Sequence, residues 1–242
     1  LAGMQWARRH APDAFWIVSA AADTPFFPTD LAARLLLAAE GKAFCAGGDF
    51  AQMSGGAGEE SALPPRGDYA DLLLAMIRAE KPIVARVNGP AMGGGLGLVA
   101  ASTFAVAETG AILGTPEINV GLFPMMIMAV LSRMVPRRKL LEMMLLGQKI
   151  TAEEALTLGL LNRVVAADGL DDAVRTITDG IAKKSPRTVA LGLRAFAAQG
   201  DLDLEAALPM LRQRLEECLA TDDAREGLIA FLEKRAPVWK GR

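Results

Sequence analysis

Two segments of the chain place a glycine-rich loop directly after an apolar run. The first reads RLLLAAEGKAFCAGGDFAQM (34–53) and the second reads KPIVARVNGPAMGGGLGLVA (81–100). Apolar runs of this length are typical of buried strands, although the Ala and Leu residues of the first run could equally form a helix. Glycine lets the backbone that follows approach another group closely. Each segment ends in residues expected to begin a helix. A strand, a glycine loop and a helix, used twice, predict an α/β fold.

The rest of the chain fits that class. Another strand is expected at 103–108 and a helix at 68–79, with Asp68 as its candidate N-cap. Thr151 and Glu154 have capping-box spacing. After Gly169 only helices are expected, over residues 170–184, 187–199, 202–219 and 222–235. We therefore predict a core domain over 1–185 and a C-terminal helical region over 186–242.

The composition removes several kinds of chemistry and partner. His10 is the only histidine, which argues against a Ser-His-Asp triad and a histidine-rich metal site, so no metal is expected. The net charge of −2 comes without blocks of like charge, and no apolar run approaches the length of a transmembrane helix. Neither nucleic acid nor a membrane is therefore an expected partner. Cys45 and Cys218 are the only cysteines, so we expect a reduced, cytoplasmic setting.

The two glycine loops suggest one kind of catalytic device. Backbone amides from two separate loops, aimed at one point, form an oxyanion hole for a carbonyl that becomes an enolate. Gly94 would lie near a helix N-terminus, where unpaired amides favour negative charge. Glycines that merely permit tight turns and close packing are the alternative, and spacing alone favours it. A third interpretation is a dinucleotide site, because residues 95–100 match G-x-G-x-x-A, although a fitting acidic residue is missing downstream.

Glu117 is the candidate acid or base. It stands in GTPEINVGLFP, directly after Pro116 and among apolar residues. Desolvation would raise the pKa of this carboxyl group and suit it to proton transfer near neutral pH. An exposed glutamate at a turn is the equally simple alternative.

Five blocks together resemble one known family. KAFCAGGDF, VNGPAMGGGLGL, TPEINVGLFP, LLGQKITAEEALTLGLLNRVV and TDDAREGLIAFLEKR stand in the order and spacing of the crotonase superfamily, the enoyl-CoA hydratase/isomerase family. The resemblance covers about residues 30–242. It implies a spiral of ββα repeats with a C-terminal helical region that forms trimers, often paired as a dimer of trimers. It also implies an acyl-CoA substrate, with no cofactor beyond the coenzyme A that the substrate carries.

The resemblance assigns roles to individual residues. Ala46 and Gly94 match the two oxyanion-hole positions, and Glu117 matches the second of two glutamates used by many hydratases of the family. The substrate-binding loop corresponds to Ala46, Gly47, Gly48 and Asp49. Phe231 and Lys234 lie in the tail helix, which commonly reaches coenzyme A, often in a neighbouring subunit.

The chain departs from the family pattern at two places. Gly97 stands where the first hydratase glutamate is expected, and residues 1–29 lack the usual opening segment. A single carboxylate favours a double-bond shift, as in Δ3,Δ2-enoyl-CoA isomerases. The alternatives are a hydratase that recruits Glu108 or Asp68, a family member that binds acyl-CoA without reaction, and a Rossmann-type oxidoreductase.

Several methionines follow the Glu117 loop. Met125, Met126, Met128 and Met134 have the helical spacing of ordinary core residues, with a flexible acyl pocket as the alternative.

Overall fold

A parallel sheet lies at the centre of the molecule. The computed structural model describes residues 15–18, 35–39, 41–47 and 68–242. The central sheet contains, in spatial order, β1 (Phe15–Val18), β2 (Leu35–Ala38), β3 (Ile83–Val87), β5 (Phe104–Glu108) and β8 (Arg163–Val165). Each neighbouring pair of these strands is parallel. Parallel sheets need cover on both faces, which explains the apolar runs of the sequence.

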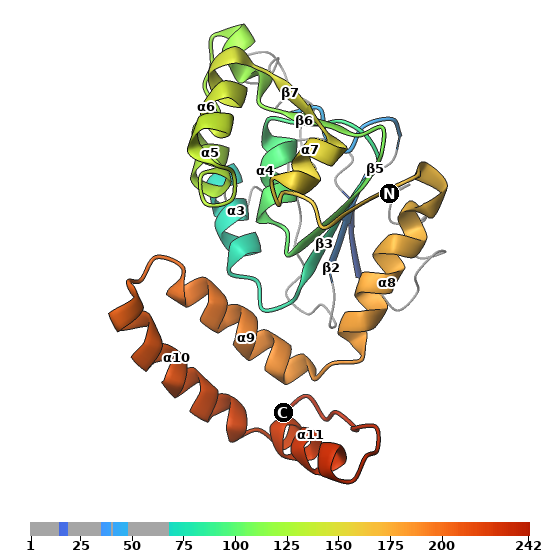
Figure 1. Cartoon of the computed structure of the whole chain (residues 1–242), viewed down its shortest axis with the longest axis vertical. Coiled ribbons are helices and arrows are strands. Elements are labelled where there is room, and N and C mark those ends of the chain that lie inside the picture. The colour runs from blue at the N-terminus through green and yellow to red at the C-terminus, as the bar shows by residue number, and fades with distance from the viewer. Residues whose placement is uncertain (1–14, 19–34, 40, 48–67) are drawn as a thin grey trace.

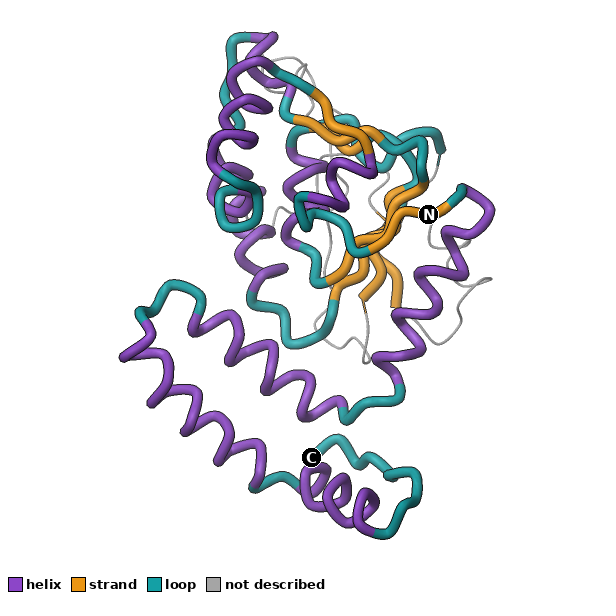
Figure 2. The backbone as a smooth tube through the Cα atoms, in the orientation of Figure 1, coloured by secondary structure: helices purple, strands orange, loops and turns teal. Residues whose placement is uncertain are grey.

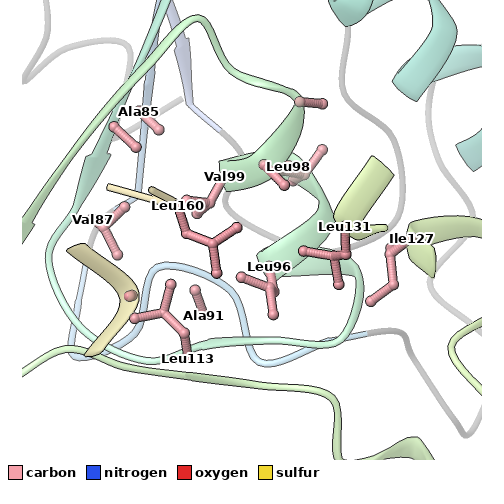
Figure 3. Close-up of a cluster of buried hydrophobic side chains, with 14 of the residues drawn as sticks. Ala85, Val87, Ala91, Leu96, Leu98, Val99, Leu113, Ile127, Leu131 and Leu160 are labelled. Atoms are coloured by element: carbon pink, nitrogen blue, oxygen red, sulfur yellow. The ribbon is translucent and has the colours of Figure 1, made fainter. Parts of the chain in front are cut away.

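Helices cover both faces of this sheet (Figure 1). Because successive side chains of a strand point to opposite faces, Ala85 and Val87 of β3 join the larger core cluster, whereas Val84 joins a smaller one. The smaller cluster is closed by α8 (Leu170–Ala182) through Leu170 and Val174. The larger one contains residues of the helices α3 (Tyr69–Ile77), α4 (Gly94–Ala101), α5 (Met125–Leu131), α6 (Arg137–Leu146) and α7 (Ala152–Thr157). Figure 3 shows how Leu96 and Leu98 of α4 meet Ile127 and Leu131 of α5 inside it.

A second, smaller sheet lies beside the first. Its strands are β4 (Ala91–Met92), β6 (Ile112–Gly114) and β7 (Lys149–Thr151). β4 and β6 are parallel, and β6 and β7 are antiparallel. The 3₁₀ turns η1 (Pro116–Val120) and η2 (Ala167–Gly169) connect strands to helices. An α/β core followed by helices confirms the fold class that the sequence predicts.

The predicted helix boundaries rest on local chemistry that the structure confirms. Asp68 accepts a hydrogen bond from the Asp71 amide, and the Asp71 side chain accepts one from the Asp68 amide. Thr151 and Glu154 form the same reciprocal pair at the start of α7. Gly147 ends α6 in the left-handed conformation that glycine adopts without strain. The expectation that the methionines after Glu117 are core is wrong for Met125, Met126 and Met134, which are 63%, 50% and 38% exposed.

The last three helices extend from the core as a helical arm, drawn in orange and red in Figure 1 and seen as a chain of helices in Figure 2. They are α9 (Pro186–Gln199), α10 (Leu204–Leu219) and α11 (Asp222–Leu232). The arm carries many exposed large apolar side chains, which include Phe196, Leu204, Leu208, Leu215, Leu219, Leu228, Phe231 and Leu232.

Two classes of feature are missing from the part of the chain that the structure describes. Within 15–18, 35–39, 41–47 and 68–242, no helix combines the length and apolar character needed to span a bilayer. Across the same residues, no three histidine, cysteine, aspartate or glutamate side chains come together as a metal site would require.

A buried carboxylate ties the end of the chain to the arm. Asp223, 1% exposed, accepts a hydrogen bond of 2.6 Å from the Ser185 hydroxyl and others from the amides of Lys240 and Gly241. The Asp223 amide in turn donates to the carbonyl of Arg242. Burial by itself raises the pKa of Asp223, but the hydrogen bonds from Ser185, Lys240 and Gly241 outweigh it, so its pKa lies below the ordinary value. Asp223 therefore holds the chain end against the start of α9.

Replacing Asp223 with alanine is expected to destabilise the protein. The change leaves the Ser185 hydroxyl and the two amides without their acceptor, which costs about 1–3 kcal/mol. For a domain of this size each lost kcal/mol lowers the melting temperature by about 2–4 °C, which thermal denaturation would measure. Asp222→Ala is the matched control, because the neighbouring Asp222 makes an exposed ion pair with Arg242 and should change the melting temperature little. Equal melting temperatures for Asp223→Ala and wild type would contradict the role given to Asp223.

Candidate active site

Three stretches of backbone run side by side and end at the same edge. Cys45 forms a parallel bridge with Ala91 of β4, and Ala91 pairs with Leu113 of β6. The amides of Phe44 and Cys45 both donate to the Pro90 carbonyl, and the Met92 amide donates to the Cys45 carbonyl. Because all three stretches are parallel, the residues that follow them leave the sheet on one side.

The residues that leave at this edge are the predicted site residues. Ala46 and Gly47 follow the first stretch, and Gly93 and Gly94 follow the second. Glu117 follows the third stretch after a short link. The Gly93 amide donates a hydrogen bond to the carbonyl of Gly114, the last residue of that stretch. The structure therefore brings Ala46, Gly94 and the Glu117 segment into one neighbourhood, although they are far apart in the sequence.

Gly93 lies directly against the Glu117 carboxylate. A Cβ atom added at Gly93 would stand 2.7 Å from Glu117 Oε1 and 3.3 Å from its Cδ, closer than packed atoms tolerate. Gly93 also has a φ of +52°, in the left-handed region that favours glycine. A side chain at this position would displace the carboxylate, so glycine is required here for two independent reasons.

The environment of Glu117 matches that of a proton carrier. Its side chain is half-buried, and its buried Oε2 atom has no hydrogen-bond partner among the described residues. Burial raises the pKa of Glu117 above its ordinary value of 4.5, and its own backbone amide offsets only part of that. A carboxylate that is poorly solvated and left without a partner is poised to exchange a proton with a bound molecule.

Two backbone amides lie at the same edge of the small sheet as the Glu117 segment. Neither the Ala46 amide nor the Gly94 amide donates a hydrogen bond to any residue that the structure describes. Gly94 begins α4, so its amide belongs to the first turn, whose N–H groups lack partners within the helix. The arrangement offers two donors at the edge where Glu117 stands.

Tyr69 joins this site, and no sequence pattern singles it out. Its hydroxyl donates a hydrogen bond of 2.5 Å to the Gly94 carbonyl, across 25 positions of sequence. Burial, followed by electrostatic repulsion from Cys45 and Glu117, raises the pKa of Tyr69 well above its ordinary value of 10.0, so the phenol remains protonated. The only signals in the sequence are that Tyr69 is the single tyrosine and directly follows the cap Asp68.

Other predicted residues lie elsewhere. Gly48 and Asp49 are outside the described residues. Phe231, 81% exposed, lies in α11 and Lys234 lies just after it, and α11 packs on α9 and α10 rather than on the elements that carry Glu117. Within one chain the structure does not bring Phe231 or Lys234 to the site.

The G-x-G-x-x-A match does not form a dinucleotide loop. Residues 95–100 lie inside α4, which begins at Gly94, whereas a dinucleotide fingerprint needs its glycines in the turn before the helix. A Cβ atom at Gly95 would stand 2.5 Å from Cys45 Cβ, so this glycine permits close packing of α4 on the Cys45 strand. The geometry does not support the oxidoreductase alternative.

The two other carboxylates considered for a hydratase have different surroundings. Asp68 is exposed, and its side chain accepts a hydrogen bond from the Asp71 amide at the start of α3. Glu108 ends β5, and its carboxylate lies beside the turn residue Gly110. The described contacts connect neither of them to Glu117.

Comparisons with known proteins agree with this geometry. The family model described as "Enoyl-CoA hydratase/isomerase" matches residues 29–242. Enoyl-CoA hydratase domain-containing protein 3, mitochondrial, of Rattus norvegicus is 36% identical over 205 residues, which are 85% of this chain and 68% of the relative. A probable enoyl-CoA hydratase of Bacillus subtilis is 35% identical over 219 residues, 88% of this chain and 84% of the relative. The crystal structure of an enoyl-CoA hydratase of Mycobacterium smegmatis superposes with a TM-score of 0.78 at 38% identity, and the match covers 85% of this chain and 80% of that one.

The relatives overturn one expectation. The rat protein and its mouse and human counterparts are mitochondrial by name, although bacterial proteins match as well. The cytoplasmic location expected from the cysteine content is therefore wrong. Two unpaired cysteines indicate a reducing environment at most, and they do not identify the compartment.

The resemblance of the five sequence blocks is thus confirmed by a family model over residues 29–242 and by solved structures that share the fold. This chain belongs to the enoyl-CoA hydratase/isomerase family, the crotonase superfamily.

Proposed function

We propose that this protein isomerises enoyl-CoA thioesters, with Glu117 as the single proton carrier. The observation that carries the proposal is the half-buried Glu117 carboxylate against Gly93, whose Oε2 has no hydrogen-bond partner among the described residues, in a site where Gly97 has no side chain. The family and the names of the relatives support an acyl-CoA thioester as the substrate.

The amides of Ala46 and Gly94 are the proposed oxyanion hole. Removal of an α-proton turns the thioester oxygen into an enolate oxygen, which carries negative charge. Two donors that are already in place stabilise this charge without reorganisation, and one such donor contributes about 2.7–4 kcal/mol to the transition state. The free amides at the edge where Glu117 stands support this assignment.

Glu117 completes the reaction by moving one proton. Its carboxylate removes a proton from the α-carbon of a 3-enoyl-CoA, and the electrons spread over a dienolate held by the two amides. The protonated Glu117 then returns the proton to the γ-carbon, which gives the 2-enoyl-CoA and restores the carboxylate. The desolvation that raises the pKa of Glu117 brings its acid and base forms closer in energy at neutral pH.

The remaining predicted residues would bind the coenzyme A part of the substrate. Gly47, Gly48 and Asp49 continue the loop of Ala46, and we propose that this loop contacts the thioester. Phe231 and Lys234 would contribute from another subunit, since α11 packs within its own arm. The exposed apolar side chains of the arm support a homotrimer or a dimer of trimers as the assembly in which this happens.

Hydration is the second candidate, because several relatives are named as hydratases or dehydratases. It needs a water that is held and deprotonated. Many hydratases of the family use a second glutamate for this, and here another acid group would have to replace it because Gly97 stands at that position. Catalytic inactivity with retained acyl-CoA binding is the third candidate. The mass of the product separates them: isomerisation leaves the mass unchanged, whereas hydration adds one water.

Replacing Glu117 with glutamine is expected to abolish turnover and to preserve binding. The amide cannot accept the α-proton, so kcat falls by a factor of about 10²–10⁴ or more. Liquid chromatography and mass spectrometry after incubation with 2-enoyl- and 3-enoyl-CoA of several chain lengths would measure the products, and calorimetry would measure binding of a saturated acyl-CoA. Glu108→Gln is the matched control and should keep wild-type rates. Full activity of the Glu117 variant would exclude the mechanism.

The raised pKa of Glu117 gives two pH effects. Glu117 must be ionised to remove a proton, so kcat/KM should rise with pH with a midpoint above the ordinary carboxyl value of 4.5. The folded state favours the protonated form, so the stability that Glu117 contributes is fully present below its unfolded pKa and is lost as pH rises through its folded pKa.

Glu117→Gln removes that pH-dependent loss and should therefore be at least as stable as wild type at neutral pH, as thermal denaturation at several pH values would show. A midpoint at or below the ordinary carboxyl value, or a marked loss of stability in Glu117→Gln at neutral pH, would contradict the desolvated environment.

A further inference from the structure

The space beside Gly97 is filled by side chains from two other helices. A Cβ atom built at Gly97 would collide with the Tyr69 hydroxyl and with Ile127 Cγ2, and it would stand 3.1 Å from Ile127 Cβ. Ile127 is buried in α5, and Figure 3 shows it beside α4 with Leu131. The lack of a side chain at Gly97 thus leaves no vacancy, because Tyr69 and Ile127 occupy that volume.

Tyr69 is held firmly in this position. It is the first residue of α3, directly after the capping box of Asp68 and Asp71. The same helix buries Leu72, Leu73 and Met76 in the core, which fixes its orientation. A residue at the start of a capped and packed helix presents its side chain with little freedom.

The phenol contacts the residue that begins α4. Its hydroxyl donates to the Gly94 carbonyl, and a Cβ atom at Gly94 would stand 3.5 Å from the tip of the Tyr69 ring. The same ring is close enough to Cys45 and Glu117 for electrostatic coupling to both. Tyr69 therefore contacts Gly94, the residue of a proposed oxyanion donor, and lies near enough to Glu117, the proposed proton carrier, to affect it electrostatically.

We propose that Tyr69 determines the reaction specificity of the site: its phenol, anchored on the Gly94 carbonyl and backed by Ile127, fills the volume in which a second acid and a reacting water would otherwise stand. The inference rests on the proposed function and deepens it. Hydration requires water oxygen to bond to the β-carbon while a proton reaches the α-carbon. Isomerisation moves one proton from the α-carbon to the γ-carbon through Glu117 and needs no water. A filled volume next to Glu117 suppresses the first reaction and permits the second.

Tyr69 acts here as a positioning residue rather than as a base. Its hydroxyl proton is committed to the Gly94 carbonyl, and the phenol remains protonated at neutral pH. Loss of the hydroxyl alone should loosen the Gly94 peptide, whereas loss of the whole ring should open the volume to water.

Product partition of three variants on 2-enoyl- and 3-enoyl-CoA tests the proposal. Tyr69→Phe keeps the ring and should lower kcat about tenfold with little change in KM and no hydrated product. Tyr69→Ala removes the ring and admits water, with Glu117 taking a proton from the water and returning it to the α-carbon, and should raise the ratio of hydrated to isomerised product about tenfold or more. Leu73→Ala is the matched control, because it removes buried volume from the same helix, and it should leave the product ratio at the wild-type value. If Tyr69→Ala does not fold, Tyr69→Leu opens part of the same volume and replaces it.

An unchanged product ratio in the folded Tyr69→Ala or Tyr69→Leu protein would overturn the proposal, as would an equal change of ratio in Leu73→Ala. A wild-type protein that turns over neither substrate would refute the proposed function, and the specificity role with it.

A stability cycle reports on the shared volume independently of activity. Gly97→Ala should lower the melting temperature strongly when Tyr69 is present and less strongly in the Tyr69→Phe background, because the hydroxyl that collides with the new methyl group is gone. Equal effects in both backgrounds would show that Tyr69 does not limit the space at Gly97, whatever the activity measurements give.

Discussion

The parallel pairing of the Cys45 strand with β4 is the contact on which the site depends. The Pro90 carbonyl accepts two amides from Phe44 and Cys45, and the Cys45 carbonyl accepts the Met92 amide, so two distant loops are fixed side by side by backbone alone. Backbone pairing is independent of side-chain identity, which leaves the following residues free to be glycine and alanine. Small residues are what an amide donor needs if a substrate is to approach it. The same edge then receives the Glu117 segment through the hydrogen bond from Gly93 to Gly114.

Much of this fold follows from local sequence signals, and much of the site does not. Asp68, Thr151 with Glu154, and Gly147 mark helix ends through hydrogen bonds or dihedral angles within a few residues, so their pattern is legible in the chain. The order of the five blocks likewise indicates the family from the sequence alone. The contact of Tyr69 with Gly94 cannot be predicted in this way, because it spans 25 positions and arises only when α3 packs on α4. Helical spacing also could not reveal that Met125 and Met126 face outward, since periodicity fixes which residues share a face but not what covers that face.

The helical arm is a second place where a sequence pattern does not predict which residues come into contact. Phe231 and Lys234 match the family pattern, yet α11 packs against α9 and α10. Within one chain these two residues therefore do not reach the candidate site. Asp223 accepts hydrogen bonds from Ser185 and from the Lys240 amide at the base of this arm. A sequence block can therefore match a family pattern while the fold of one chain keeps its residues away from the candidate site.

The glycines of α4 illustrate why one position cannot be interpreted alone. Gly93 leaves room for the Glu117 carboxylate, Gly95 for Cys45, and Gly97 for Tyr69 and Ile127, so each absent side chain is replaced by one from another element. A carboxylate introduced at Gly97 would therefore collide with Tyr69 and Ile127, and making room for it would require changing those neighbours as well. Under the proposed mechanism, the chemistry of Glu117 depends on this packing as much as on its own position, because the groups that surround the carboxylate would decide whether water can take part in the reaction.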